Sequence, residues 1–225
     1  MSMLVVAPIT AEFEALAGAF GERWGSPVLR EAGRVAVREY EAAGVILAEG
    51  GFGKVQYGVT TQHLLDHLPD VDLVVCAGVA GALADSVGVG DVVVATATVE
   101  HDFYSEVLRR VPPRIDGSGE HLTMLAGTVG EADAPFRVHF APIASGDEGI
   151  SDRDRKEDIR ARTEALAVAF EGAGGARSAL FSGVPFLEVR AISDMAEGDI
   201  LTELEANLPD VMQNVAAVVA RLAGP

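Results

Sequence analysis

Three carboxylates follow apolar segments of the chain at points where they could do chemistry. Glu12 comes shortly after the first apolar run, and Glu171 and Asp194 each end a later one. Each of them alone is more typical of a helix cap or a surface group than of a catalytic residue. Together at one edge of a sheet they could serve as acid, base and hydroxyl acceptor, the groups that cleavage of a glycosidic bond requires.

The elements that must hold these carboxylates are indicated by the hydrophobic pattern. Short apolar runs predict buried strands, and apolar residues three or four positions apart predict helices between them. Strands are expected over 3–8, 34–42, 44–50, 72–78, 91–99, 138–145 and 186–194, a strand running into a helix over 165–181, and helices over 10–20, 54–68, 152–163 and 200–222. The polar, irregular residues 101–137 predict a loop plus a helix.

Three of these helices carry more specific expectations. In helix 54–68, Val55, Val59, Leu64 and Leu68 lie near one face, and the apolar face at Val59 is a candidate interface together with the glycine-rich segment 78–90. The charged helix 152–163 is expected to lie exposed on the surface. The terminal helix contains Pro209, and because proline lacks an N–H we expect an interruption there.

Buried strands interleaved with helices indicate an α/β fold with a mainly parallel sheet covered on both faces. In such sheets, ligands bind at the carboxyl ends of the strands. Five predicted strands end in glycine or a polar group, in the stretches LAEGGFGK, VCAGVAG, IASGD, AFEG and RAISD. Glycine lets backbone amides approach a ligand, and acidic groups can contact it. The five endings therefore predict the edge of a pocket.

Composition limits the class of protein. With 225 residues, 49% hydrophobic and 23% charged, the chain is expected to form one globular domain over residues 1–225. No apolar run approaches the roughly 18 residues of a membrane span, and the N-terminus lacks the basic region of a signal peptide. The net charge of −17 argues against nucleic acid and anionic membranes as partners. The single Cys76 permits no internal disulfide, so we expect a cytoplasmic protein.

Several familiar site motifs are absent or better explained otherwise. GGFGK (50–54) lacks the spacing of a phosphate-binding loop, and the glycines around 88–91 precede a strand, which favours a tight turn over a dinucleotide site. No G-x-S-x-G motif of the α/β-hydrolases occurs. His63 and His67 are spaced as zinc ligands could be, but surface histidines on a helix are far commoner. We expect no metal and no cofactor.

At the level of motifs, the chain resembles the purine nucleoside phosphorylase and nucleosidase superfamily, and within it the 5'-methylthioadenosine/S-adenosylhomocysteine nucleosidases. VVAPITAEFEAL is similar to the first strand and helix of that family, EGGFGKVQ to its S-G-I-G-K-V, and CAGVAGALADSVGVGDVVVA to its glycine segment and the V-G-D-I-V-V that follows. IASGDEGI resembles V-S-G-D-x-F-[IV], and FLEVRAISDMA resembles V-V-V-R-A-I-S-D-V-A. The last motif is the most specific, and the resemblance covers nearly the whole chain.

The resemblance implies a three-layer α/β/α sandwich with a twisted mixed sheet, and a homodimer. It implies cofactor-free cleavage of the N-glycosidic bond of a purine nucleoside. Asp194 would protonate the purine, Glu12 would activate the attacking water, and Glu171 would accept hydrogen bonds from the ribose hydroxyls. The remaining residues that the resemblance places against the substrate are Phe170 under the ribose, Ile150 at the purine edge, Ser193 beside Asp194, and Gly78 and Val79 in the glycine segment.

Water is favoured over phosphate as the nucleophile. Phosphorylases of the superfamily place an arginine shortly before the glycine segment and a serine within it. Here LVVCAGVAG contains no arginine, and Val79 stands in the place of that serine. An anion site without cationic donors is unfavourable in so acidic a protein.

Three positions depart from the family pattern and bear on the substrate. Ala169 and Phe170 replace a glutamate and a methionine in the stretch V-E-M-E, and Gly149 replaces a purine-stacking aromatic, whose place Phe103 or Tyr104 would have to take. Futalosine hydrolase of menaquinone biosynthesis and a phosphate-dependent phosphorylase are therefore alternatives. A nucleoside-binding protein without activity is a third, although the intact Glu12, Glu171 and Asp194 argue against it.

Overall fold

The computed structural model describes residues 2–103, 111–128 and 135–223. Its strands are β1 (Met3–Ala7), β2 (Val28–Ala32), β3 (Val35–Tyr40), β4 (Val45–Glu49), β5 (Leu73–Ala82), β6 (Val92–Glu100), β7 (Arg114–Asp116), β8 (Val138–Ser145), β9 (Ala167–Ala169) and β10 (Phe186–Asp194). Its helices are α1 (Thr10–Trp24), α2 (Gly53–His67), α3 (Gly119–Thr128), α4 (Arg153–Thr163), α5 (Gly172–Ser182) and α6 (Ile200–Leu222), with a 3-10 turn η1 (Glu41–Ala43).

The strands form one mixed sheet, in the order β10-β6-β8-β9-β5-β1-β4-β3-β2, with β7 beside β6. Because β10 also pairs with β5, the strands β5, β10, β6, β8 and β9 close into a ring at one end of the sheet. β1, β4, β5 and β10 run parallel, whereas β10 meets β6, and β5 meets β9, antiparallel. β6–β8 and β8–β9 are parallel as well, whereas β2–β3, β3–β4 and β6–β7 are antiparallel. The parallel strands expected from the hydrophobic pattern thus make up half of the described pairings, and the mixed sheet implied by the family resemblance is confirmed.

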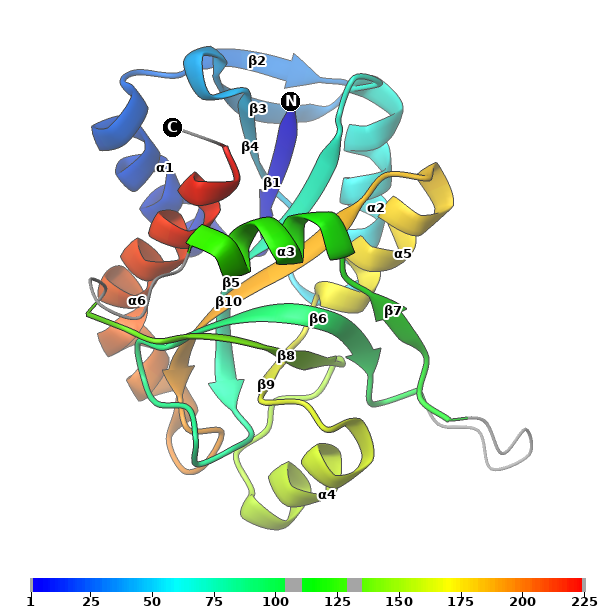
Figure 1. Ribbon diagram of the computed structural model, residues 1–225, viewed down its shortest axis with the longest axis vertical. Helices are drawn as coiled ribbons and strands as arrows, with labels where there is room; N and C mark the ends of the chain where they lie inside the picture. Colours follow the sequence, from blue (N-terminus) through cyan, green and yellow to red (C-terminus); the bar gives the residue numbers. More distant parts are fainter. Residues whose placement is uncertain (1, 104–110, 129–134, 224–225) are drawn as a thin grey trace.

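Helices cover both faces of the sheet and give the three layers of the sandwich (Figure 1). On one face α1 and α6 bury their apolar stripes against the sheet, and α3 packs beside them. On the other face α2 and α5 lie against each other, with Tyr57, Leu64 and Ala176 in a second core. α4 stands apart, at the end of the ring of strands (Figure 1).

Several local predictions need correction. Val55 and Val59 of α2 do not share the burial of Leu64, which the spacing placed near the same face: both valines are exposed, whereas Leu64 and Tyr57 are buried. α6 continues through Pro209, since that residue lies on the exposed side, where water can satisfy the freed carbonyl. The edge strand β2 was not expected.

Residues 101–137 contain β7 and α3, of which only the helix was expected; residues 104–110 and 129–134 lie outside the described residues. Within the described ranges, no helix has both the length and the apolar character that crossing a membrane demands.

β10 is the strand that matters most for the site. All nine of its residues are buried, including Glu188, Arg190, Ser193 and Asp194. It lies between β5 and β6, so charged side chains here are enclosed by protein on both sides. Charged groups in such a position require partners, and these partners build the site.

Candidate active site

One cavity gathers the three carboxylates that the sequence singled out. Strand β5 contributes Val79, Ala80 and Gly81 to its wall. Of the carboxylates, Glu12 comes from α1, Glu171 from the turn after β9, and Asp194 from the end of β10. β9 reaches the cavity because its Ala167 and Val168 pair antiparallel with the last residues of β5, which brings Glu171 to the same place as Asp194. The full lining comprises Pro8, Ile9, Glu12, Phe52, Val79, Ala80, Gly81, Val168, Ala169, Phe170, Glu171, Arg190, Ser193, Asp194, Ile200, Leu201 and Leu204.

Asp194 is held at the end of β10 by neutral donors. The Ser193 hydroxyl donates to its Oδ2 at 2.8 Å, and the backbone N–H of Ala196 donates to its Oδ1 at 2.9 Å. Burial raises the pKa of Asp194, while these two hydrogen bonds act against the rise. The result is a carboxyl group that keeps its proton to a higher pH than an exposed aspartate does.

Glu12 lies in the first turn of α1 and is 2% exposed. Its Oε1 accepts the N–H of Val79 at 2.8 Å, and its Oε2 accepts the N–H of Ile9 at 3.1 Å. Burial raises the pKa of Glu12 to about 7, an effect that Arg190 opposes and Glu171 reinforces. A carboxyl group with this pKa can take up and release a proton near neutral pH.

Arg190 is a buried cation in the wall that the sequence analysis missed. It is 1% exposed, and its Nη2 donates to Glu171 Oε2 at 3.0 Å while its Nε donates to Glu188 Oε1 at 3.0 Å. Its Nη1 donates to the Val79 carbonyl at 3.2 Å. We call Arg190 with Glu12, Glu171 and Glu188 the arginine cluster. The sequence contains a signal for this cluster: an arginine lies inside an otherwise apolar strand. A buried guanidinium needs carboxylates around it, so this arginine predicts acidic partners.

Glu171 connects this cluster to the N-terminus of α2. It is 3% exposed, and its Oε1 accepts the N–H of Gly53 at 3.3 Å. Ser145, at the end of β8, fixes the turn that carries it, because its hydroxyl donates to the Phe170 carbonyl and accepts the N–H of Ala173, each at 2.9 Å. The carboxylate is therefore held from three neighbouring segments.

Gly78 and Val79, the two predicted residues of the glycine segment, have different places in the site. Val79 lines the cavity and donates its N–H to Glu12. Gly78 is absent from the lining and lies behind it, where a Cβ would come within 2.5 Å of Glu12 Oε1 and 2.7 Å of Arg190 Nη1. Glycine is thus needed at 78 so that Glu12 and Arg190 can approach each other.

The remaining predicted residues line the apolar parts of the site. Phe170 packs on Phe52 with ring centroids 4.7 Å apart, and both rings face the cavity. Ile150 is buried and lines an adjoining pocket with Gly149 and Asp194. A Cβ on Gly149 would meet no described atom closer than 3.9 Å, so the space of the missing aromatic side chain is open. Phe103 lines neither pocket, and Tyr104 lies outside the described residues.

The two histidines considered as zinc ligands make local hydrogen bonds. His63 Nε2 accepts the N–H of Arg34 at 2.9 Å, and His67 Nδ1 lies 2.8 Å from the His63 carbonyl. No third histidine, cysteine or carboxylate joins them within the residues that the structure covers. The pair is explained as a surface feature of α2.

Comparison with known proteins decides the family. The model of the phosphorylase superfamily matches residues 3–224. The chain belongs to the phosphorylase superfamily. Within that superfamily, it is 33% identical to the 5'-methylthioadenosine/S-adenosylhomocysteine nucleosidase of Actinobacillus succinogenes over 218 residues, which cover 93% of this chain and 92% of the relative. The motif resemblance is confirmed.

Solved structures of the superfamily share the fold. The 5'-methylthioadenosine/S-adenosylhomocysteine nucleosidase from S. pneumoniae, solved with a transition-state inhibitor, superimposes with a TM-score of 0.89 at 24% identity, covering 99% of this chain and 98% of that one. Futalosine hydrolase of Helicobacter pylori gives a TM-score of 0.87 at 24% identity, covering 99% and 97%. The predicted nucleoside phosphorylase-like α/β fold is therefore confirmed.

Proposed function

We propose that this protein is an N-glycosyl hydrolase that cleaves a purine nucleoside of the 5'-methylthioadenosine/S-adenosylhomocysteine type to the free base and the ribose derivative. One observation carries the proposal: a single cavity presents two buried carboxyl groups, Glu12 and Asp194, whose pKa values are both raised. Acid and base catalysis on one bond needs such a pair. The similarity to nucleosidases over most of the chain supports the assignment.

Asp194 is assigned to the leaving group. Protonation of the purine at N7 draws electrons from the glycosidic bond and makes the base a better leaving group. The backbone N–H of Ala196 can only donate, so Oδ1 is held as an acceptor, whereas the Ser193 hydroxyl beside Oδ2 can turn to accept. The proton of the carboxylic acid is therefore favoured on Oδ2. Ile150 and the space beside Gly149 lie on this side of the cavity, which we call the base end.

Glu12, Glu171 and Arg190 form the opposite, ribose end. Glu12 in its ionised form takes the proton of the attacking water. Glu171 offers its carboxylate to the ribose hydroxyls, and Phe170 packs beneath the sugar. The transition state carries positive charge on the ribose, so carboxylates held nearby in a buried site stabilise it.

Water is the proposed nucleophile because the described lining offers phosphate no free cation. Arg190 is the one cationic side chain among the lining residues, and its Nε, Nη1 and Nη2 donate to Glu188, Val79 and Glu171. A phosphate dianion would also meet the negative charge of Glu12 and Glu171. Hydrolysis avoids both costs.

The 5' end of the nucleoside would face apolar side chains. Ile9, Phe52 and Leu204 line the cavity there without a charged group among them. A charged 5' substituent would lose its hydration against these residues, whereas a thioether would not. This favours a methylthio-type substrate, and futalosine remains the alternative to be tested.

The assay that tests the function uses four substrates. The protein is incubated with 5'-methylthioadenosine, S-adenosylhomocysteine, futalosine and inosine, with and without phosphate, and free base is measured. Phosphate-independent release of adenine from the first two is expected. Release that requires phosphate would identify a phosphorylase, release from futalosine alone a futalosine hydrolase, and no release with retained binding a nucleoside-binding protein.

We further propose that the protein is a cytoplasmic homodimer whose 225 residues act as one domain. Val55 and Val59 on α2 and Leu180 and Phe181 on α5 are exposed apolar side chains on two helices that pack together. Exposed apolar side chains gathered on two packed helices are typical of an interface. Phe52, which lines the cavity, is also exposed next to these helices.

The cytoplasmic location is supported by Cys76. Its buried thiol is free, as a reducing compartment allows.

Sedimentation of the wild type and of two variants tests the dimer. Val59→Glu should shift the mass toward the monomer, because it places a charge in the proposed interface. Leu29→Glu, at an exposed apolar position on the edge strand β2, is the control and should leave the mass unchanged. A monomeric wild type would refute the assembly.

A further inference from the structure

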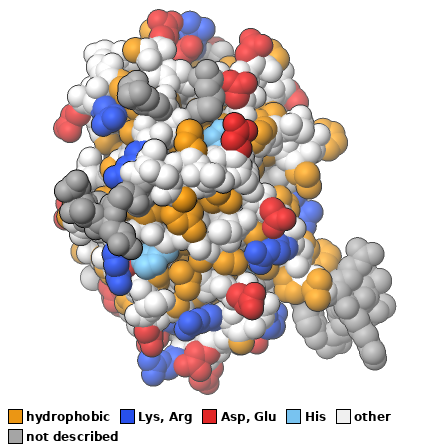
Figure 2. Space-filling model, in the orientation of Figure 1, with side chains coloured by type: hydrophobic (Ala, Val, Ile, Leu, Met, Phe, Trp, Pro, Cys, Tyr) orange, Lys and Arg blue, Asp and Glu red, His pale blue; other side chains and the backbone are white. Residues whose placement is uncertain are grey.

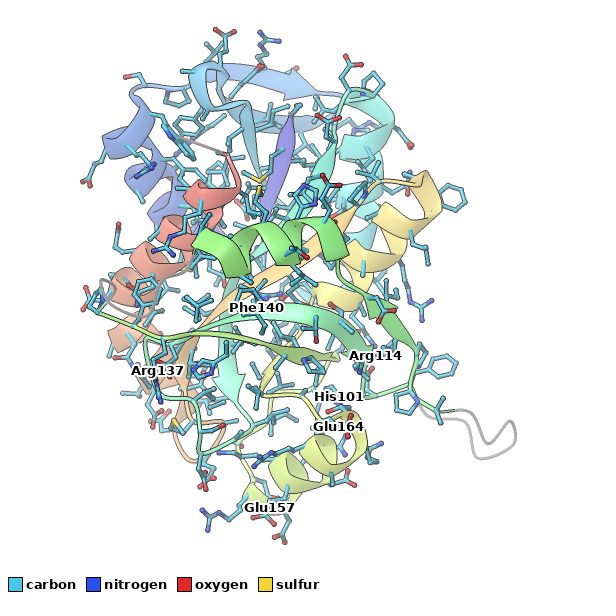
Figure 3. All side chains as sticks on the ribbon, viewed as in Figure 1. His101, Arg114, Arg137, Phe140, Glu157 and Glu164 are labelled. Carbon is cyan, nitrogen blue, oxygen red and sulfur yellow. The ribbon has the colours of Figure 1, made fainter. Side chains whose placement is uncertain are left out.

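Helix α4 carries one lysine that does not share the exposure of its neighbours. Acidic and basic side chains mix at the end of the molecule where α4 lies (Figure 2), and Glu157 projects outward from that helix (Figure 3). Lys156, the residue before it, is 4% exposed, and it is one of two lysines in the chain. A buried ammonium is costly unless it is hydrogen-bonded, so its partners are informative.

Those partners lie in the turn that directly follows Asp194. Lys156 Nζ donates to the Met195 carbonyl at 2.8 Å and to Glu197 Oε1 at 3.1 Å. The two acceptors flank Ala196 on either side. The lysine therefore connects α4 to the backbone immediately beyond the proposed acid.

Ala196 sits in an unfavourable backbone conformation. Its φ is +52°, in the left-handed region that side chains disfavour and glycine adopts readily. Such a residue keeps this conformation when surrounding contacts impose it. The conformation directs its N–H to Asp194 Oδ1 at 2.9 Å.

We propose that Lys156 is a positioning residue for Asp194. By bonding on both sides of Ala196, it holds the turn in the left-handed conformation, and the turn holds the carboxyl group so that its proton is on Oδ2. Lys156 itself does not contact the substrate cavity. This inference rests on the proposed role of Asp194 as the acid.

The charges around Asp194 agree with this placement. Lys156 lowers the pKa of Asp194 through its charge, against the larger effect of burial, and Glu203 of α6 raises it. Glu197 is bonded to Lys156 itself. Glu148, which lines the pocket next to Asp194, is neutralised by two-pronged hydrogen bonds from Arg155. Loss of Lys156 thus removes a cation and, by releasing the turn, weakens the hydrogen bond from Ala196 N–H to Asp194. Both favour ionised Asp194, so its pKa rises.

Two variants at matched positions on α4 test the proposal. Lys156→Met keeps the length of the side chain and removes the ammonium, whereas Arg153→Met removes a cation that also pairs with Glu197 but is exposed. For Lys156→Met we expect kcat to fall roughly tenfold or more with KM little changed, because misaligned acids lose rate. We expect Arg153→Met to resemble the wild type.

The pH profile separates positioning from a general structural defect. Asp194 acts in its protonated form, so kcat falls as the pH rises through its pKa. In Lys156→Met this limb should move to higher pH by roughly half a unit or more. A uniform loss at all pH values would show that the lysine only supports the fold, and would overturn the proposal.

A second change tests the link through Ala196. Glycine at 196 adopts positive φ without steric cost, so Ala196→Gly should restore part of kcat in the Lys156→Met background. If Lys156→Met fails to fold, Lys156→Arg is used instead, with a smaller shift of the same sign expected. No rescue and no shift would contradict the proposal.

A carbon-13 NMR titration of the Asp194 carboxyl tests the role of Lys156 independently of enzymatic activity. It reports the pKa in wild type, Lys156→Met and Arg153→Met without requiring turnover. Activity in the wild type with an unchanged Asp194 pKa in Lys156→Met would refute the inference alone. No turnover in the wild type would refute the proposed function, and the titration would still show whether Lys156 acts on Asp194.

Discussion

The ribose end and the base end of the cavity both bury carboxyl groups, but they surround them with different partners. At the ribose end, Glu171 bonds directly to Arg190, and Glu12 lies near enough for the same cation to lower its pKa. At the base end, Asp194 accepts hydrogen bonds from a serine hydroxyl and a backbone N–H, which carry no charge.

This difference suits the two proposed roles. A base must be able to lose its proton at neutral pH, so a nearby cation helps Glu12. An acid must keep its proton, so Asp194 is better served by neutral donors and by burial. The same cavity can thus give two carboxyl groups opposite functions through their partners.

The largest effect is expected at the base end, from Asp194→Asn. The amide has no acidic proton, so kcat should fall by about 10³-fold, within the range for loss of a general acid. Substrate affinity, measured by calorimetry, should change little. Asp199→Asn, the same substitution at the N-cap of α6, is the control and should retain activity. Turnover in Asp194→Asn would remove Asp194 from its role.

The ribose end should show the largest effect on stability, through Arg190→Met. Removing the cation leaves Glu12, Glu171 and Glu188 buried together, which should cost about 3–5 kcal/mol of unfolding free energy. Urea unfolding measures it. Arg177→Met breaks the half-exposed pair with Glu100 and should cost no more than about 1 kcal/mol. A loss as small as that of the control would show that Arg190 does not neutralise the cluster.

The pH dependence of stability in Glu12→Gln tests how burial acts on the carboxyl group at the ribose end. The pKa of Glu12 is raised to about 7 in the folded state, so the folded protein binds this proton more tightly than the unfolded chain does. The contribution of Glu12 to wild-type stability should therefore decrease as the pH rises from about 4.5 to about 7. Relative to the wild type, Glu12→Gln should gain about 1–3 kcal/mol between pH 5 and pH 8.

The control for this measurement is Glu14→Gln on the exposed side of the same helix. It should show no such pH-dependent gain, since Glu14 pairs with Arg38 at the surface. If the two variants gave the same change in unfolding free energy between pH 5 and pH 8, burial would not raise the pKa of Glu12.

The smallest effect is expected from Gly149→Phe at the base end. The open space there would receive a ring beside the purine, and stacking on a base is worth about 1–3 kcal/mol. Part of this gain is offset by ordering the side chain, so KM for the cleaved nucleoside should fall about fivefold. An unchanged KM would show that the purine does not lie against Gly149.

The sequence was sufficient for the described strands other than β2 and β7 and for the three carboxylates, because each carboxylate follows an apolar run and the motifs fix their order. It did not reveal the arginine cluster. Glu188 and Arg190 sit within a run treated as apolar, and their pairing depends on β5 and β9, which come from elsewhere in the chain. The ring of strands could not be predicted either, because a hydrophobic run does not indicate in which direction a strand runs or with which strands it pairs.

Surface features were the other source of error. The spacing places Val55, Val59 and Leu64 near one face, but periodicity alone does not state that Leu64 is buried while the two valines are exposed. Lys156 shows the reverse case, a charged residue in a charged helix that is buried because its tip finds two acceptors. Both depend on how helices dock, which local sequence does not specify.

The contact between α2 and α5 has a consequence for the width of the cavity. A Cβ on Gly174 would overlap the carbonyl oxygen of Lys54, so the two helices touch backbone to backbone. Phe52 directly precedes α2, and Phe170 comes two residues before α5. The close approach of the two helix backbones therefore constrains how far apart these two rings lie. Side-chain changes on the outer surfaces of the helices are expected to alter the proposed assembly without altering this spacing.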